Sequence, residues 1–301
     1  MGILDSLIGK LSSSEAMANS ENISKVTTDK ANSIIKELSG ANINKKKKII
    51  DNLVLFTGAS GGTGVSTLVA NIGYALAKKG LHVLVIDLNI LFPSQYNYLG
   101  IKQSLEENDL LSFLFGECSV GECIKQSADM DLVYANNRSI PDLINASNNQ
   151  SLQNFSIFLK KVRNLYDIIL IDCPMRIDDM LCNNAMYYAD SIYCVWDEGL
   201  SSIANTERVR RALALTGVDS YTKMRAILNK RTAIRYNTLP MDKMNLELIG
   251  ILPFSSDVID SSLGAQVFCD KGKATSDNGI EFAKKIIEIA DKVAKIGGLV
   301  E

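Results

Sequence analysis

A glycine-rich turn near residue 60 carries the residue types of a phosphate-binding loop. The stretch GASGGTGVST, residues 58–67, follows an apolar run, and its four glycines allow tight backbone turns. Backbone N–H groups of such a turn, together with the positive end of the next helix, can bind an anionic phosphate. Ser66 stands where a hydroxyl group would contact Mg²⁺. The motif G-x-x-x-x-G-K-[ST], however, would place a lysine where this sequence has Val65.

Two carboxylates follow later apolar runs that read as strands. Asp87 ends the run VLVID, and Asp172 ends the run IILID. Ligands bind beyond the carboxyl ends of the strands in open parallel sheets, so we expect both side chains near the glycine-rich turn, where they could hold Mg²⁺ directly or through water. Asn229 ends a further run, and its amide is a candidate contact for a base edge. Each aspartate alone could be a turn residue, but the three features together favour a nucleotide site.

Apolar strands alternate with helical patterns from residue 49 onward. Strands are expected at 53–57, 82–88, 131–135, 167–172, 190–196, 225–229 and 247–252. Helices are expected at 66–79, about 107–115, 150–165, 177–188, 201–216 and 280–296. Strands that are apolar on both faces and separated by helices predict an α/β fold, with a mostly parallel central sheet and helices on both faces.

The composition narrows the function classes. Of 301 residues, 47% are hydrophobic and 22% charged, enough for a sizeable core, and the net charge of −2 argues against a global nucleic-acid binder. A single histidine leaves little material for histidine catalysis or zinc. The six cysteines form no C-x-x-C pair, and we expect free buried thiols rather than a metal site. Without a secretory signal or an apolar run of about 18 residues, we expect a cytoplasmic protein.

The first 48 residues differ from the rest. Residues 1–11 predict a short amphipathic helix, and 12–48 form a polar linker ending in four lysines, before a nucleotide-binding domain at 49–301. The apolar arc of the helix consists of Ile3, Leu4, Leu7, Ile8 and Leu11. It could contact the inner face of the cytoplasmic membrane peripherally through residues 3–11, or dock on its own domain or a protein partner.

The motifs and their order resemble the MinD/ParA family of P-loop ATPases, the group within the SIMIBI class that has a deviant Walker A loop. The resemblance covers about residues 50–296. It is carried by SGGTGVST, VLVIDLNILFPSQYNYLG, YDIILIDCP, ADSIYCVWDEGLSSIANTERV, AILNK and GILPFSSDVIDSSLGAQVF. The lysine-poor loop is similar to that of TadZ/CpaE-type pilus-assembly localisation proteins.

The resemblance implies a P-loop NTPase fold and a site for ATP or ADP with Mg²⁺. The positions that match the phosphate cradle are Gly61, Gly62, Thr63, Gly64, Val65, Ser66 and Thr67. Ser66, Asp87 and Asp172 match the metal shell, both aspartates are candidates for a catalytic role, and Asn229 and Pro253 match the base contacts. The resemblance further implies a homodimer with the nucleotide between its subunits, which binds a membrane, DNA or a protein partner.

Three positions depart from the family pattern. The main loop lysine is Val65, the signature lysine that reaches the partner subunit's nucleotide is Ser60, and the second aspartate after the following strand is Asn89. We therefore expect a positioning or scaffold protein with weak or absent hydrolysis, such as one that places a pilus or secretion assembly at the membrane. The alternative is an active MinD/ParA-type ATPase in DNA partitioning, cell division or flagellar placement. The basic runs 208–211 and 229–235 could contact DNA or be solvated surface.

Overall fold

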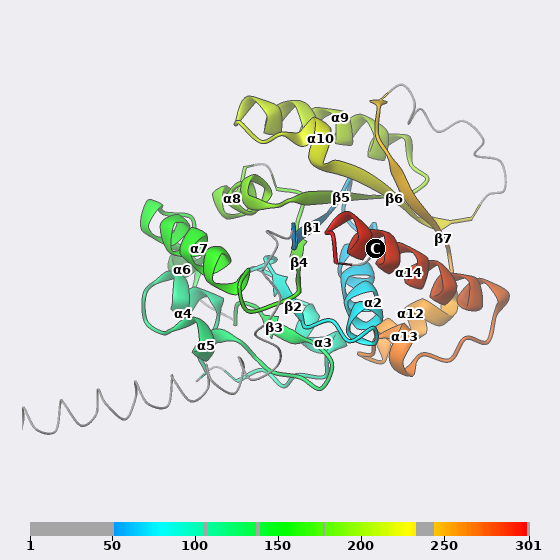
Figure 1. The fold of residues 1–301 in the computed structure, drawn as a ribbon, viewed down its shortest axis with the longest axis horizontal. Helices are drawn as coiled ribbons and strands as arrows, with labels where there is room; N and C mark the ends of the chain where they lie inside the picture. The colour runs from blue at the N-terminus through cyan, green and yellow to red at the C-terminus, as the bar shows by residue number, and fades with distance from the viewer. Residues whose placement is uncertain (1–50, 105–106, 137–138, 177, 233–243, 300–301) are drawn as a thin grey trace, which may run out of the picture. The chain divides into compact units, whose positions relative to one another are not determined.

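Seven parallel strands form the centre of the domain in this computed structural model, which describes residues 51–104, 107–136, 139–176, 178–232 and 244–299 (Figure 1). Their bounds are Leu53–Gly58 (β1), Val83–Asp87 (β2), Asp131–Val133 (β3), Ile168–Cys173 (β4), Ser191–Trp196 (β5), Met224–Arg231 (β6) and Leu248–Pro253 (β7). The spatial order is β3-β2-β4-β1-β5-β6-β7, and every pair of neighbours is parallel. All carboxyl ends therefore lie on one edge of the sheet.

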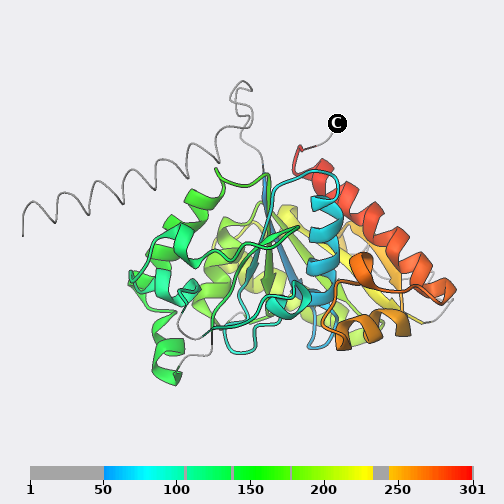
Figure 2. The same ribbon diagram turned by 90° about the horizontal axis from the view of Figure 1, so that it is seen from below.

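Helices cover both faces of the sheet (Figure 2). One face carries α2 (Val65–Ala77), α12 (Ser256–Leu263), α13 (Phe268–Lys271) and α14 (Asp277–Ile296), with α14 packed on α2 and β7. The other carries α4 (Leu110–Leu114), α7 (Asn149–Val162), α8 (Met180–Tyr188) and α9 (Leu200–Leu215). Further short helices are α3 (Gln95–Tyr98), α5 (Val120–Cys123), α6 (Ile140–Asn145) and α10 (Ser220–Lys223).

The sheet has a separate apolar core on each face. Strands β1, β2, β4 and β5 are buried along their whole length, as expected for strands that are apolar on both sides. In β1, for example, Leu55 belongs to one core and Phe56 to the other. Each fully buried side chain of this size contributes about 1.5–3 kcal/mol relative to an exposed one, so the sheet is a rigid base for its edges.

The seven expected strands are all present, within two residues at either end. The short helices α3, α5, α6, α10, α12 and α13 were not expected, because four to eight residues give too little periodicity. All six cysteines are free. No described helix is long and apolar enough to span a membrane. The amphipathic segment 1–11 and the linker 12–48 lie outside the described residues.

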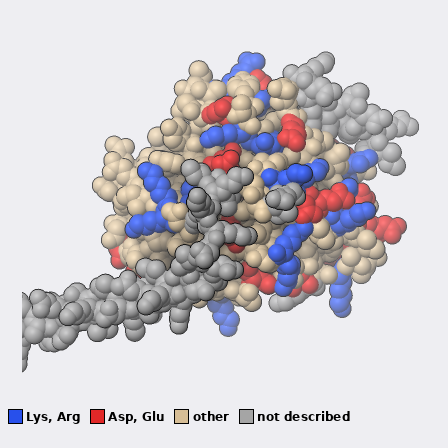
Figure 3. Space-filling view, viewed as in Figure 1, with Lys and Arg blue, Asp and Glu red and all other residues tan. Residues whose placement is uncertain are grey.

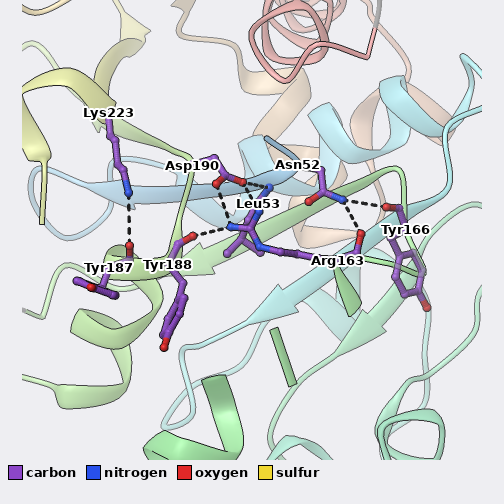
Figure 4. Close-up of polar contacts among 8 residues, drawn as sticks. All are labelled: Asn52, Leu53, Arg163, Tyr166, Tyr187, Tyr188, Asp190 and Lys223. Carbon is purple, nitrogen blue, oxygen red and sulfur yellow. Dashed lines mark hydrogen bonds and ion pairs between the residues drawn. The ribbon is translucent and has the colours of Figure 1, made fainter. Parts of the chain in front are cut away.

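A network of hydrogen bonds and an ion pair connects the amino ends of the central strands (Figure 4). The Arg163 guanidinium donates to both carboxylate oxygens of Asp190, at 2.8 and 2.9 Å, and to the Tyr188 carbonyl at 2.7 Å. Asp190 also accepts the Leu53 N–H at 2.9 Å, and the Asn52 amide donates to the Arg163 carbonyl at 3.1 Å. Each polar group thus has a partner where β1 and β5 begin.

One arginine of the basic run 208–211 is buried, and the second run, 229–235, is described only as far as residue 232. In the run 208–211, Arg210 is 1% exposed, donates to the Met244 carbonyl at 2.6 Å and packs against the Tyr221 ring. Arg211 is paired with Glu207. Arg210 is therefore neither solvated surface nor available to DNA, because α9 turns it toward the core. Figure 3 shows basic and acidic side chains interspersed over the face it displays.

Candidate functional site

The glycine-rich turn joins β1 to α2 at the carboxyl edge of the sheet. Gly62 and Gly64 have φ angles of 81° and 93°, a left-handed conformation that side-chain-bearing residues rarely adopt. Gly64 is also needed for a close approach, because a Cβ atom there would lie 2.6 Å from Nδ2 of Asn229. The path of the turn therefore depends on glycine at these two positions.

Side chains from other elements hold the carbonyl groups of this turn. Nζ of Lys230 donates to the Gly62 carbonyl at 2.6 Å, and Nδ2 of Asn229 donates to the Thr63 carbonyl at 2.8 Å. From α9, Nδ2 of Asn205 donates to the Ala59 carbonyl at 3.1 Å. In a trans peptide the C=O group and the N–H group of the next residue point in opposite directions. Each of these three hydrogen bonds therefore directs the N–H group of the next residue away from the side chain that holds the carbonyl.

The N–H groups of this turn form an open cradle. Among the described residues, the backbone N–H groups of 61–66 donate no hydrogen bond to another protein group. Helix α2 begins with Gly64 at its N-cap, has no side-chain cap and has no acidic residue in its first turn. Its positive end is therefore uncapped, and the cradle has the donors and the field that bind phosphate.

Position 65 contributes packing rather than charge. Val65 lies against the apolar core between α2 and the sheet. Ser60 is partly exposed, and its carbonyl accepts the Thr63 hydroxyl at 3.3 Å. The Lys230 ammonium group does contact the turn, but it donates to the Gly62 carbonyl and does not lie among the N–H groups. The cradle is thus built from backbone dipoles, and no cation of the turn itself supplements them.

The two predicted aspartates meet at the carboxyl edge. Asp87 and Asp172 are register partners on β2 and β4, and their residues are 0% and 3% exposed. Asp87 accepts backbone N–H groups from Asn89, Ser94 and Gln95, at 3.0, 2.7 and 3.0 Å. The loop after β2 therefore wraps around Asp87. Asn89 contributes its N–H to that wrapping.

Gln95 connects the aspartates to the glycine-rich turn, and sequence reasoning did not find it. Its side chain is fully buried, and Nε2 donates to Asp172 Oδ2 at 2.6 Å and to the Ser66 carbonyl at 3.0 Å. Its Oε1 atom is buried without a partner. The only signal available was its place eight residues after Asp87, within the loop that follows a strand.

The electrostatics of this pair favour protonation or a bound cation. Burial raises the pKa of Asp87 to about 7, and repulsion from Asp172 adds to the rise against three opposing backbone hydrogen bonds. Burial also raises the pKa of Asp172, against hydrogen bonds from Gln95 and the Ser66 hydroxyl. Among the described residues, no basic side chain is a main cause of either shift. Two buried like charges without a counter-ion are unfavourable, which a divalent cation would relieve.

A cavity of about 270 Å³ lies beside the turn, on the side of α12. It is lined by Gly64, Thr67, Tyr98, Asn229, Lys230, Pro253, Phe254, Ser255, Val258, Ile259, Ser262, Leu263 and Phe282. Apolar walls with a few polar groups are typical of a pocket for a flat organic ring. The Thr67 hydroxyl lies 2.9 Å from the Tyr98 hydroxyl, so α3 also borders this pocket.

The structure brings the sequence-predicted site residues to one edge, in two groups. Thr67, Asn229 and Pro253 border the cavity, while Asp172 accepts the Ser66 hydroxyl and has Asp87 as its register partner. The side-chain amide of Asn229 differs from the expectation in one respect, because one of its donors is used by the Thr63 carbonyl.

Comparisons with known proteins agree with this geometry. The family model described as an AAA domain matches residues 51–214. Septum site-determining protein MinD from Synechocystis is 26% identical over 223 residues, covering 71% of this chain and 80% of that protein. Pyrococcus horikoshii MinD, solved with Mg-ADP, has a TM-score of 0.67 at 22% identity, covering 82% and 97% of the two chains. A ParA family ATPase from Chlorobium tepidum has a TM-score of 0.65 at 20% identity, covering 81% and 98%.

Proposed function

This chain belongs to the AAA-domain family of the matching model and to the MinD/ParA P-loop ATPases, and from that premise we propose a nucleotide-binding positioning or scaffold protein with weak or absent ATP hydrolysis. The observation that carries the proposal is the cradle. Its carbonyl groups are fixed by Asn229 and Lys230 and its N–H groups are open, yet Val65 and Ser60 give it no charge.

The residues at this edge fit a magnesium nucleotide. The open N–H groups of 61–66 and the uncapped α2 terminus suit phosphate oxygens. The Ser66 hydroxyl and the Asp172 carboxylate are hard oxygen donors, the type that Mg²⁺ prefers, and they already contact each other. Bound Mg²⁺ would supply the counter-charge that the buried carboxylates lack. The Mg-ADP complex of the Pyrococcus horikoshii relative supports the same ligand class here.

Hydrolysis demands more than binding does. Phosphoryl transfer depends on charge placed around the transferring group, and each missing group typically costs about a hundredfold or more in rate. Val65, Ser60 and Asn89 together lack two cations and one carboxylate that the family pattern supplies. Lys230 does not compensate, because its ammonium lies on the carbonyl side of the turn. The site thus keeps the features for binding and lacks those for catalysis.

Thermal unfolding and phosphate release test this proposal together. Millimolar Mg-ATP or Mg-ADP should raise the melting temperature of the full chain, while steady-state phosphate release stays near the buffer rate. Val65→Lys should strengthen ATP binding more than it raises turnover, since Ser60 and Asn89 remain. If the melting temperature did not change with either nucleotide, that result would contradict binding. Wild-type turnover comparable to that of lysine-bearing relatives would instead support the alternative of an active partitioning or division ATPase.

We also propose that the chain forms a homodimer across the nucleotide face, as the family resemblance implies. Ser60 cannot bridge to the nucleotide of a partner subunit by charge, so association should depend little on ATP. Sedimentation velocity with and without Mg-ATP measures this. A strictly monomeric protein, or a strong ATP-driven shift to dimer, would contradict the proposal.

Peripheral membrane contact through residues 3–11 is proposed from the sequence pattern alone, since this segment lies outside the described residues. It would place the protein, and an assembly or secretion machine that it positions, at the inner face of the cytoplasmic membrane. Leu7→Asp puts a charge in the centre of the apolar arc and should abolish co-sedimentation with anionic liposomes. Ser6→Asp, outside the arc, is the matched control. Equal binding by wild type and Leu7→Asp would exclude this anchor.

A further inference from the structure

Gln95 joins both buried carboxylates to the glycine-rich turn by hydrogen bonds. Its backbone N–H donates to Asp87 Oδ2 at 3.0 Å. Its side-chain Nε2 donates to Asp172 Oδ2 at 2.6 Å and to the Ser66 carbonyl at 3.0 Å. The carbonyl can only accept, so Nε2 rather than Oε1 must face this pair of oxygens. Gln95 therefore places a neutral donor beside the carboxylates, where no counter-charge lies among the causes of their shifts.

The Gln95 amide and a cation bound at Asp172 exclude each other. Asp172 is 3% exposed and already has two neighbours, the Ser66 hydroxyl and the NH₂ group of Gln95. The Ser66 oxygen can join Asp172 as a ligand of Mg²⁺. The NH₂ group presents positively polarised hydrogen atoms and has no acceptor capacity, so it repels a cation. Metal binding at this carboxylate therefore requires the amide to move.

The Gln95 side chain is also poorly satisfied in the place that it occupies. It is fully buried, and among the described residues its Oε1 atom has no hydrogen-bond partner. A buried acceptor without a partner is unfavourable. Displacing the amide from Asp172 thus breaks hydrogen bonds on one branch of a side chain whose other branch gains nothing from its position.

Movement of Gln95 affects α3 and the loop before it. Gln95 is the first residue of this four-residue helix, and the last, Tyr98, places its hydroxyl 2.9 Å from the Thr67 hydroxyl at the border of the cavity. The loop that leads into α3 exposes two large apolar side chains, Leu91 at 42% and Phe92 at 76%. The hydrogen bonds of Gln95 therefore connect the metal ligands to a segment that other molecules can reach.

We propose that the Gln95 amide takes the place of the cation in the ligand-free protein and that Mg²⁺ displaces it from Asp172, which loosens α3. This inference rests on the proposed nucleotide binding and adds the regulation of its metal site. Gln95 acts through Asp172, so it is a positioning residue and not a metal ligand. Its hydrogen bond lowers the affinity of the site for Mg²⁺ and makes residues 88–98 respond to metal separately from phosphate.

Calorimetric titration of ATP into the full chain, with MgCl₂ or with EDTA in the buffer, measures how much Mg²⁺ strengthens binding. Gln95→Met has a side chain of similar length without the donor. Its enhancement by Mg²⁺ should exceed that of wild type by about three- to tenfold, the size of one hydrogen bond, while its affinity in EDTA changes less than about twofold. Asn97→Ala, an exposed position on the same helix, is the matched control and should leave both affinities unchanged.

Gln95→Lys tests the same idea with the opposite sign. An ammonium group beside the carboxylates supplies permanently the charge that the cation brings, so the enhancement by Mg²⁺ should fall below that of wild type. An enhancement that falls or stays unchanged in Gln95→Met would overturn the proposal, because Gln95 would then assist metal binding or play no part in it. An enhancement in Gln95→Lys as large as in wild type would overturn it too.

Hydrogen exchange of wild-type residues 94–99 gives a readout that needs no variant. Exchange should be at least about threefold faster with Mg-ATP than with ATP in EDTA, because the anchor of α3 is lost when the metal binds. Equal or slower exchange with Mg-ATP would contradict the loosening of α3. Failure of ATP to bind in either buffer would refute the proposed function itself, whereas ATP binding without any enhancement by Mg²⁺ would refute this inference alone.

Discussion

Among the described residues, the buried polar groups at the amino edge of the sheet have protein partners, whereas several at the carboxyl edge do not. At the amino edge, Asp190 has the Arg163 guanidinium on both oxygens and a backbone N–H besides (Figure 4). At the carboxyl edge, Asp87 and Asp172 are neighbouring buried carboxylates, and no described basic side chain is a main cause of their raised pKa values. Buried groups without a partner, such as Oε1 of Gln95, lie there as well.

This difference separates the edge that holds the fold together from the edge that is prepared for a ligand. Removing one partner of a buried pair leaves the other unsatisfied and costs stability, and a buried group that has no protein partner costs stability until a ligand satisfies it. Removing a charged side chain at the amino edge should therefore lower the stability of the protein. Removing one of the two carboxylates at the carboxyl edge should raise the stability of the ligand-free protein. Four experiments test this contrast, beginning with the largest expected effect.

Gly64→Ala should have the largest effect. The new Cβ would combine a φ of 93° with a contact of 2.6 Å to Asn229, which displaces the side chain that fixes the Thr63 carbonyl. We expect about 3 kcal/mol lower stability and at least about tenfold weaker nucleotide binding. Denaturant unfolding and nucleotide titration measure the two losses. The stability control is Gly61→Ala, whose Cβ meets no atom within 4 Å; equal destabilisation by both variants would contradict this account of the turn.

Arg163→Met should weaken the amino edge alone. It leaves the Asp190 carboxylate and the Tyr188 carbonyl without their guanidinium donor, at a cost of about 2 kcal/mol for a largely buried pair. Nucleotide affinity should stay unchanged, since the cradle lies at the opposite edge. Urea denaturation and titration of the folded variant provide both values. A loss of nucleotide affinity without a loss of stability would reverse the assignment of the two edges.

The carboxylate pair should also make stability depend on pH. The pKa of Asp87 is raised to about 7, so the folded protein binds this proton more tightly than the unfolded chain. The free energy of unfolding should therefore be highest below the unfolded pKa and should fall as pH rises through about 7, by on the order of 1–2 kcal/mol between about pH 5 and 8. Chemical unfolding across this range measures the slope, which Arg163→Met should retain. A stability that rises over the same interval would contradict the shift.

Asp172→Asn should have the smallest effect on stability and the opposite sign from Arg163→Met. Removing one of two buried carboxylates relieves repulsion, so the ligand-free variant should gain about 1 kcal/mol near pH 8 and lose part of the pH slope. The extra stabilisation that Mg²⁺ gives with ATP should decrease, because a hard anionic ligand is lost. A ligand-free variant less stable than wild type at pH 8 would show that Asp172 has a structural role instead.

The sequence predicts the strands and the convergence of the main site residues for one physical reason. Runs such as 83–86 and 168–171 are apolar throughout, and parallel strands place the residues at their carboxyl ends, here Asp87 and Asp172, on one edge. The end of the run at Asn229 marked its amide as a candidate base contact, and the family resemblance added Pro253; both residues border the cavity.

The remaining site residues depend on chain path rather than on pattern. Gln95 and Tyr98 lie in a four-residue helix whose position is set by the wrapping of the loop around Asp87. Lys230 reaches the turn because the end of β6 is irregular and its own φ is 57°, which no periodicity indicates. The burial of Arg210 was missed because a run of basic residues on a helix is usually solvated.

Hydrogen exchange of the backbone amides of residues 60–67 tests the central claim most directly, that this turn is an open phosphate cradle. Exchange would be followed in the full chain with and without millimolar Mg-ATP, with the amino-edge amide of Leu53 as the internal reference. We expect rapid exchange of the turn amides in the free protein, because the backbone N–H groups of 61–66 donate to no other described protein group, and at least about tenfold slower exchange with Mg-ATP. Unchanged exchange at 60–67 would contradict the account.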